Sequence, residues 1–479
     1  MSHFIEPSPA IAVEPAAPGQ GAWRTFRDAL RGAPIDYTTA PIGRGVIMLA
    51  VPMVMEMAME SIFAVADVFW VAHLGAGAVA TVGLTESMLT LIYTVAMGLS
   101  IGAMALVSRR IGQRDPEGAS RAAAQSILLG VFVAAVIAIF AAPRAADLLR
   151  LMGASPEVVA TGSGFTAIML GGNVTVMLLF LINAVFRGAG DAAIAMRVLW
   201  FGNLINIVLG PCFIFGLGPF PELGVAGAAV ATNIGRGSAV VYQLVTLMRG
   251  RTRVTVRLEH LRLDLALMRG VVRLSGSGTL QILIGTASYI GLIRILSAFG
   301  SDALAGYTIG FRVIIFALLP AFGISNAAAT MVGQNLGAGR PDRAERAVWT
   351  AALYNMIFLG VIGAVFYFAA RPIAGLFTAD PAVQPFAISC LRIVSLGFVF
   401  YAVGMVLTQS FNGAGDTWTP TLINLGVFWL FEIPLAWLLA VKAGFGPVGV
   451  FVAMTIAYSA LAVVSAVVFR MGRWKGKSV

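Results

Sequence analysis

The sequence predicts an all-α polytopic membrane protein with about twelve transmembrane helices in two repeated halves. Of its 479 residues, 59% are hydrophobic and only 11% are charged, and the mean hydropathy is +0.89. A soluble globular chain has roughly 45–50% apolar and about 25% charged residues. The apolar stretches are continuous rather than alternating, which favours membrane-spanning helices over a transmembrane barrel.

Apolar runs, and the charged residues that interrupt them, define the predicted spans. Each run is long enough to cross a hydrocarbon layer of about 30 Å as a helix, with all backbone groups hydrogen-bonded within the segment. An even number of spans places both termini on one side of the membrane. The predicted spans are 46–72, 78–107, 122–142, 162–186, 194–217, 224–248, 271–299, 303–332, 347–370, 387–411, 419–440 and 447–469.

The spans divide the chain into five segments. They are an N-terminal tail 1–40, a six-helix lobe 41–248, a basic linker 249–268, a second six-helix lobe 269–470 and a basic tail 471–479. The first tail is rich in Pro and Ala and is expected to lie outside the fold. Within it, residues 21–32 have two open interpretations: an interfacial helix with Trp23 and Phe26 beside several arginines, or a disordered tail.

Lys and Arg residues collect in alternate loops and in both tails. Most of the 32 basic residues lie there, whereas the opposite loops hold Arg144, Arg150, Arg371 and Lys442. This bias predicts that both termini are cytoplasmic, in a bacterial inner membrane or an archaeal cell membrane. Topology thus explains the net charge of +10 without a nucleic-acid partner. Membrane lipid is an expected partner, and the basic linker either contacts anionic headgroups or is solvated.

An internal repeat relates the two halves at a constant offset of 225 residues. Arg44-Gly-Val recurs as Arg269-Gly-Val, and Phe186-Arg-Gly-Ala-Gly-Asp recurs as Phe411-Asn-Gly-Ala-Gly-Asp. Each half has six spans, so the halves run parallel, related by an axis along the membrane normal. Transporters built in this way usually bind substrate between the halves and alternate access by rocking one half against the other.

Intramembrane carboxylates point to an ion-coupling site. Glu56, Glu60 and Asp67 share the first span, four and seven residues apart, so they lie on one helical face. A carboxylate inside a bilayer costs several kcal/mol, on the order of 3, which makes it a functional candidate by default. The alternative is that these are neutral or hydrogen-bonded structural residues.

Polar side chains on other spans of the first half would complete such a site. Asn203 and Asn206 lie on the predicted span 194–217, and Thr232 lies on the span 224–248. For these residues, ligation of a coupling ion and hydrogen bonding between helices both remain open.

The second half does not repeat the acidic stripe. Gln281, Gly285 and Leu292 occupy the corresponding positions. We predict that Glu432 and Gln281 of the second half and Met57 of the first span line a substrate cavity. Glu432 has two open interpretations, an acid that attracts cationic substrate or a salt bridge to Arg294 or Arg312. Met57 and its neighbouring methionines would give an adaptable apolar wall, or pack against lipid.

Several motifs together resemble the multidrug and toxic compound extrusion (MATE) family, most closely its DNA-damage-inducible protein F subgroup. The resemblance runs from about residue 40 to 465. It rests on Pro52…Asp67-Val-Phe-Trp…Leu74-Gly75, on Val332-Gly-Gln-Asn-Leu-Gly-Ala-Gly339, on both Phe-x-Gly-Ala-Gly-Asp turns and on the stretch from Asn206 to Thr232.

The resemblance implies two pseudo-symmetric six-helix lobes around a V-shaped central cavity, in which H⁺ or Na⁺ entry drives export of cationic or amphipathic compounds. Asp67 and Asn206 match the family's cation-binding positions. Gly210 stands where the subgroup usually has a second aspartate, so Asp67 needs another acidic partner, and Glu60 is the best candidate. We favour H⁺ over Na⁺, because burial in a bilayer favours the protonated form of a carboxyl group.

Other function classes have less support. A lipid-linked saccharide flippase of the same superfamily would be expected to have a strongly basic cavity, whereas the buried charges predicted here are mainly acidic. An intramembrane enzyme lacks support, because the sequence has no His-Glu-x-x-His motif and its three histidines, His3, His73 and His260, all fall in predicted tails or loops. We therefore expect a monomeric antiporter without a cofactor, whose small-molecule substrate the sequence does not identify.

Overall fold

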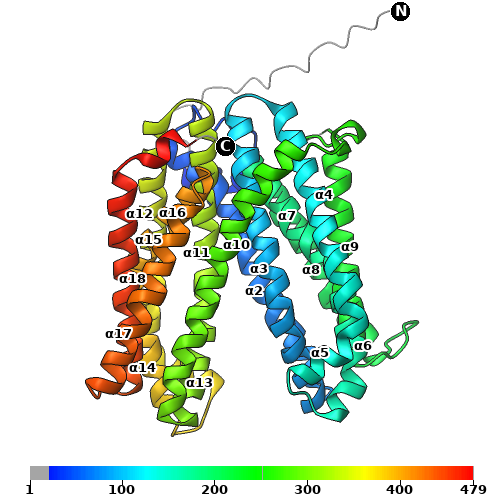
Figure 1. The fold of residues 1–479 in the computed structure, drawn as a ribbon, viewed down its shortest axis with the longest axis vertical. Helices are drawn as coiled ribbons and strands as arrows, with labels where there is room; N and C mark the ends of the chain where they lie inside the picture. The colour runs from blue at the N-terminus through cyan, green and yellow to red at the C-terminus, as the bar shows by residue number, and fades with distance from the viewer. Residues whose placement is uncertain (1–20, 251, 478–479) are drawn as a thin grey trace, which may run out of the picture.

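The computed structural model describes residues 21–250 and 252–477, and every regular element within them is helical. Two bundles of long helices converge at one end and diverge at the other (Figure 1). After α1 (Ala22–Arg31), the first lobe contains α2 (Ile42–Ala72), α3 (Ala76–Gly112), α4 (Pro116–Ala141), α5 (Ala145–Leu151), α6 (Pro156–Gly171), α7 (Asn173–Ala189), α8 (Ala192–Phe215) and α9 (Val225–Met248).

The second lobe follows the linker, which includes the short helix η2 (Leu258–Leu261). It contains α10 (Leu265–Leu296), η3 (Ser297–Phe299), α11 (Ser301–Gly337), α12 (Pro341–Phe368), α13 (Ala370–Phe377), α14 (Gln384–Ser395), α15 (Phe398–Gly413), α16 (Trp418–Asn424), η4 (Leu425–Glu432), α17 (Ile433–Trp437), η5 (Leu438–Lys442) and α18 (Pro447–Arg470). A last short helix, η6 (Arg473–Gly476), closes the described chain.

The predicted fold class is confirmed. In the described residues, ten helical segments are long and apolar enough to cross a membrane, and the bent pair α14–α15, with a 59° angle, makes eleven. The remaining predicted span is α9, a 24-residue helix that carries Asn233, Arg236 and Gln243 and is therefore less apolar. Several helices extend beyond the predicted spans, because a helix continues past the apolar layer into its basic ends.

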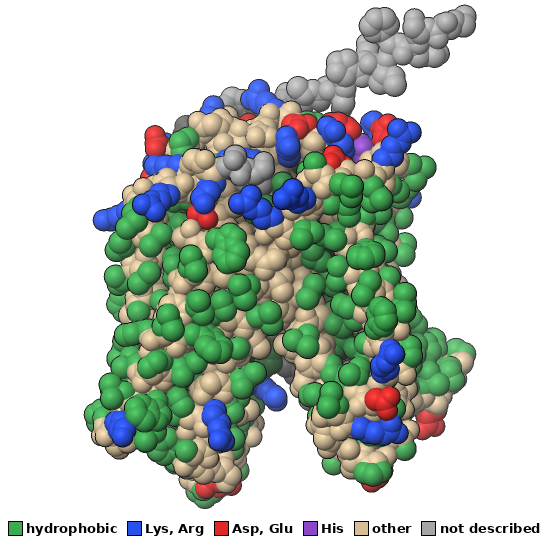
Figure 2. Space-filling model, viewed as in Figure 1, with side chains coloured by type: hydrophobic (Ala, Val, Ile, Leu, Met, Phe, Trp, Pro, Cys, Tyr) green, Lys and Arg blue, Asp and Glu red, His purple; other side chains and the backbone are tan. Residues whose placement is uncertain are grey.

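One end of the molecule carries both described chain ends, α1 and η6, and we call it the terminal face. Lys and Arg side chains gather there, hydrophobic side chains cover the flanks, and a cleft separates the lobes at the opposite end (Figure 2). The flanks include exposed Phe132, Ile139, Ile357 and Val361. An apolar belt of this kind fits the hydrocarbon layer of a bilayer.

The lobes pack on each other through equivalent pairs of helices, α2 with α11 and α3 with α10. Glycines related by the 225-residue offset permit this approach. A side chain at Gly98 would meet Thr279 of α10, and one at Gly323 would meet the backbone of Met53 in α2. The repeat in the sequence is therefore also a repeat in the contacts between the lobes.

The Asp of each Gly-Ala-Gly-Asp turn pairs with a basic residue from the segment that follows its lobe. Asp191 accepts a hydrogen bond from the backbone N–H of Arg253 at 3.1 Å, and the Arg253 side chain lies 3.8 Å away. Asp416 lies 3.2 Å from the Nζ atom of Lys477. These pairs hold the linker and the C-terminal segment against the terminal face.

Residues 33–40, which we call the interlobe strap, differ from expectation. The sequence assigns all of 1–40 to a tail outside the fold, whereas the strap packs between the lobes; residues 1–20 lie outside the described part. Tyr37 donates its hydroxyl hydrogen to the Gly190 carbonyl of the first lobe, and its own carbonyl accepts from Asn335 of the second. Of the two interpretations of 21–32, the structure has the helix, with Trp23 exposed.

Close packing of Gly112 against the second lobe gives a testable prediction. A methyl group at position 112 would meet the carbonyl oxygen of Gln334 in α11, so Gly112→Ala should separate the lobes at the terminal face. With nitroxide labels at the exposed residues Leu151 and Leu376, we expect a shorter distance across the cleft end. Gly83→Ala, in open space on the same helix, is the control. An unchanged distance distribution in Gly112→Ala would contradict a rocking motion about this contact.

Candidate functional site

The α2 helix carries the candidate acids of the first lobe, and its neighbours determine what each acid can do. Glu56 is almost fully buried. Its Oε1 atom accepts one hydrogen bond from Asn183 at 2.9 Å and one from Arg187 at 2.7 Å, both from α7. Glu56 is therefore held in a buried ion pair with Arg187, which lies just beyond the predicted span 162–186.

The second lobe contains neither charge of this ion pair. At the 225-residue offset, Gln281 corresponds to Glu56, and Asn412 corresponds to Arg187. Both neutral residues are buried, and the Oε1 atom of Gln281 has no hydrogen-bond partner among the described residues. A buried charge is tolerated when it is paired. If Glu56 and Arg187 form a structural pair, both charges should be lost together, as they are in the second lobe.

Glu60, one turn along α2 from Glu56, is in a different environment. Its side chain is partly buried, and Oε2 accepts a hydrogen bond from Asn203 of α8 at 3.3 Å. Among the described ion pairs, none includes Glu60. The predicted neighbours Glu60 and Asn203 are thus in contact.

Asn206 and Thr232 form a second polar contact of the predicted set. Asn206, one turn from Asn203 on α8, donates to the Thr232 hydroxyl of α9 at 2.8 Å, and both side chains are buried. The contacts of α8 therefore connect α2 and α9 through polar side chains. The structure brings four of the six predicted ion-coupling residues into this one arrangement.

Asp67 of α2 and Gly210 of α8 lie farther from the terminal face than the residues above. The backbone of Asp67 is in α2, two turns beyond Glu60, but its side chain lies outside the described residues. A Cβ atom at Gly210 would have Trp70 of α2, at 3.8 Å, as its one neighbour within 4 Å among the described residues, which is an ordinary contact distance.

The second lobe holds one buried carboxylate of the predicted cavity, at Glu432. Its Oε2 atom accepts a hydrogen bond from Ser288 of α10 at 3.2 Å. Within the described residues Glu432 has no ion pair, and Arg294 and Arg312 are both exposed. The described residues therefore show no salt bridge from Glu432 to Arg294 or Arg312. Met57, the other predicted lining residue, is partly buried on α2.

A buried arginine of α9 was not singled out from the sequence. Arg236 donates to the Tyr93 hydroxyl at 3.0 Å, and its guanidinium lies 5.7 Å from the centre of the Phe63 ring and 5.8 Å from that of Tyr93. Its electrostatic neighbours include Glu86, which also interacts with Arg312. Arg236 is the one charged residue in an otherwise uncharged predicted span, and that pattern could have marked it as a functional candidate. The first lobe therefore contains a buried cation as well as buried acids.

Comparison with protein families identifies the architecture. The MatE family model matches residues 52–212 and 279–438, one block in each lobe. The probable multidrug resistance protein NorM of Thermotoga maritima is 25% identical over 448 residues, covering 91% of this chain and 94% of its own. The FAD transporter of Shewanella oneidensis is 25% identical over 401 residues, covering 83% and 88%.

Solved structures resemble this one over nearly the whole chain. An outward-facing multidrug resistance MATE family transporter of the MOP superfamily has a TM-score of 0.86 and 26% identity, with 92% of this chain and 98% of the other covered. A MOP superfamily transporter from Pyrococcus furiosus, described as having a binding pocket of reverse polarity, has a TM-score of 0.85 and 25% identity, with 94% and 98% covered. The predicted family resemblance is confirmed, while the subgroup stays a prediction.

Proposed function

Because this chain belongs to the MatE family of membrane transporters, in which relatives carry out multidrug efflux, we propose that it is an H⁺-coupled antiporter. It exports cationic or amphipathic small molecules by alternating access. Protons enter through the α2 carboxylates, and the substrate leaves through the cleft between the lobes.

The environment of Glu60 carries this proposal. A coupling carboxylate must take up and release a proton during each cycle, so its charge cannot be fixed by a permanent counter-charge. Glu56 is held by Arg187, whereas Glu60 has an amide partner, Asn203, which can hydrogen-bond to either protonation state. We therefore place coupling at Glu60 together with Asp67 and assign Glu56 to positioning α2 against α7.

The choice of H⁺ over Na⁺ follows from the number of oxygen ligands. A hard metal cation requires several oxygen ligands at once, whereas a proton requires one carboxylate oxygen. Gly210 removes a carboxylate from the outer part of the cluster, which weakens a Na⁺ site more than a proton site. The Asn206–Thr232 contact then orders α8 against α9 beside the coupling acids.

The distribution of basic residues supports one orientation of the protein in the membrane. We place the terminal face in the cytoplasm of a bacterial or archaeal cell, because Lys and Arg gather there (Figure 2). The cleft then opens to the outside, as in the outward-facing solved relative. In this state substrate is released and the α2 carboxylates are accessible to external protons.

Transport in reconstituted vesicles tests the coupling. We expect an imposed proton gradient to drive export of ethidium, and we expect no export with a Na⁺ gradient alone when a protonophore is present. The measurement is fluorescence of accumulated ethidium, with protein-free vesicles as control. Export driven by Na⁺ in the presence of protonophore would contradict proton coupling, and no export under either gradient across a panel of cations would contradict cation export.

Two observations favour a second candidate, the lipid-linked saccharide flippase or another transporter of anionic substrates. Arg236 places a buried cation in the first lobe, and one relative is an FAD transporter. The same vesicles loaded with FAD discriminate the two: gradient-driven movement of FAD without movement of ethidium would support the anionic alternative.

A further inference from the structure

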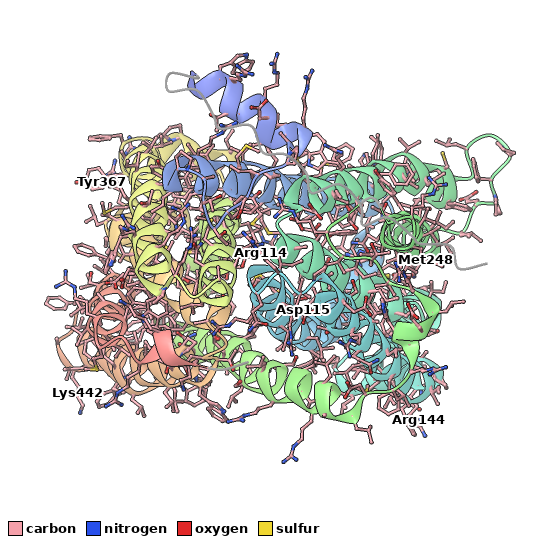
Figure 3. The ribbon with its side chains drawn as sticks, turned by 90° about the horizontal axis from the view of Figure 1, so that it is seen from above. Arg114, Asp115, Arg144, Met248, Tyr367 and Lys442 are labelled. Atoms are coloured by element: carbon pink, nitrogen blue, oxygen red, sulfur yellow. The ribbon has the colours of Figure 1, made fainter. Side chains whose placement is uncertain are left out.

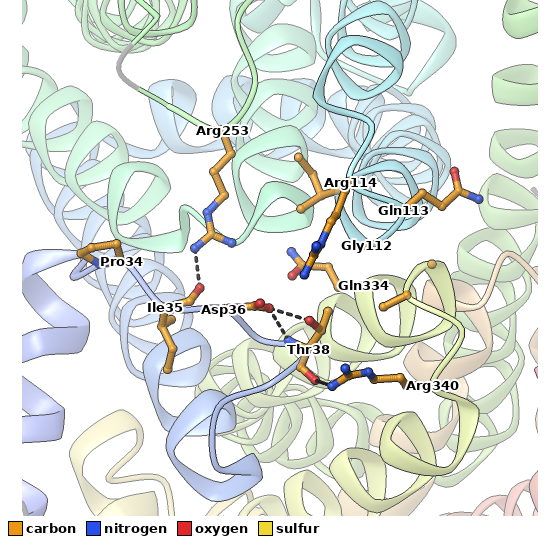
Figure 4. Close-up of a pocket in the computed structure, with 13 residues that line it drawn as sticks. Pro34, Ile35, Asp36, Thr38, Gly112, Gln113, Arg114, Arg253, Gln334 and Arg340 are labelled. Atoms are coloured by element: carbon orange, nitrogen blue, oxygen red, sulfur yellow. Dashed lines mark hydrogen bonds between the residues drawn. The ribbon is translucent and has the colours of Figure 1, made fainter. Parts of the chain in front are cut away.

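A pocket of about 530 Å³ opens on the terminal face at the seam between the lobes (Figure 4). We call it the seam pocket. Its walls come from the interlobe strap, from the turn after α3 in the first lobe, from the turn after α11 in the second lobe, and from the linker. Viewed from above, Arg114 lies near the middle of this face (Figure 3). The volume is in the range of small-molecule sites, about 300–1,000 Å³.

Three arginines from different parts of the chain extend toward the seam pocket (Figure 4). Arg253 of the linker donates to the Ile35 carbonyl at 2.5 Å, and Arg340 of the second lobe donates to the Thr38 carbonyl at 2.7 Å. These contacts orient two guanidinium groups along the strap. Each guanidinium has five N–H donors, so donors remain on both for a ligand.

Arg114 differs from the other two, because its side chain has no hydrogen-bond or ion-pair partner among the described residues. Its backbone is in the left-handed region, with φ +59°, and it is the one non-glycine residue of the described chain with positive φ. At the 225-residue offset the second lobe has Gly339, with φ +69°. The first lobe thus keeps an arginine where its repeat has the glycine that this turn favours. The turn itself therefore does not require an arginine at this position.

Asp36 is the one acidic residue that lines the seam pocket. Its Oδ1 atom accepts from the backbone N–H of Thr38 at 2.8 Å and from the Thr38 hydroxyl at 2.6 Å. Burial raises the pKa of this carboxyl, but those hydrogen bonds, one from Thr39 and the charge of Arg253 outweigh it, so the pKa lies below its ordinary value. Asp36 is therefore ionised, and the three arginines leave the lining positively charged.

We propose that the seam pocket binds a phosphate group, carried by a cytoplasmic small molecule or by an anionic lipid headgroup. The planar guanidinium group of arginine matches phosphate oxygens in geometry and charge. Arg114 supplies a guanidinium group that has no other partner among the described residues. Because both lobes line the pocket, a bound phosphate favours the state in which they are together at this face. It would therefore slow the opening of that face and act as a brake on export.

Binding of inorganic pyrophosphate to the full chain, in nanodiscs of neutral phosphatidylcholine at fixed ionic strength, tests the site. We expect saturable binding by calorimetry. Arg114→Gly and Arg340→Gln should each raise the dissociation constant by at least about tenfold, as loss of a charge-assisted contact predicts. Arg114→Gly relieves backbone strain, so it should fold. Arg346→Gln, an exposed arginine outside the pocket, should leave the constant unchanged.

The membrane composition distinguishes the two sources of phosphate. If lipid headgroups occupy the pocket, nanodiscs of phosphatidylglycerol should weaken pyrophosphate binding in the wild type; if a soluble molecule is the ligand, the two membranes should give the same constant. Absence of saturable binding in phosphatidylcholine, an unchanged constant in Arg114→Gly, or an equal loss in Arg346→Gln would each overturn the proposal. The assay requires no transport, so its result is independent of the proposed export.

Discussion

Asp67→Asn and Glu60→Gln should each abolish proton-driven export, with a fall of at least about two orders of magnitude in the initial rate. Each substitution keeps the size and hydrogen-bonding capacity of the side chain but removes the group that carries the proton. General acid–base groups contribute about 10²–10⁴ to the steps they serve, and a transporter without its proton carrier loses the coupling altogether. The measurement is ethidium export in vesicles with an imposed pH gradient.

The controls for these variants separate coupling from folding. Glu157→Gln removes an exposed acid at the start of α6 and should export at the wild-type rate. Ethidium binding by the detergent-solubilised variants should persist, because the substitutions leave the cleft intact. If Glu60→Gln exports at the wild-type rate with an unchanged pH profile, then Glu60 has a structural role and its pairing with Asp67 is wrong.

The spans and the repeat could be predicted because each leaves a signal in the linear sequence. Hydropathy marks the helices, and the 225-residue offset marks equivalent positions. The offset does not reveal which equivalent helices touch, however. Packing of α2 on α11 and of α3 on α10 depends on glycines such as Gly98 and Gly323. Glycine is also common in loops and turns, so its presence does not mark a contact between helices.

Two parts of the site escaped prediction for different physical reasons. Arg187 lies just beyond the predicted span 162–186, whereas the observed α7 continues to Ala189 and places Arg187 one turn beyond Asn183, where it contacts Glu56. The interlobe strap has no hydrophobic periodicity to detect. It is held through its backbone carbonyls, as at Ile35 and Thr38, and every residue type has a carbonyl.

The Glu56–Arg187 ion pair should contribute the largest single stability effect in the first lobe. Glu56→Ala leaves the Arg187 guanidinium in a site where its side chain is only 9% exposed. Removing one partner of a buried pair costs about 3–5 kcal/mol. We expect a loss of this order in the free energy of unfolding, measured by denaturant titration in mixed micelles and followed by circular dichroism.

The second lobe supplies the matched control, because it already contains the neutral version of this pair. Glu56→Gln combined with Arg187→Asn copies Gln281 and Asn412, and this double variant should lose far less stability than the sum of the two single variants. Non-additivity of this kind measures the coupling between contacting residues. The double variant should also keep proton-driven export, since Glu60 and Asp67 are unchanged. Wild-type stability with abolished export would instead place Glu56 among the coupling residues.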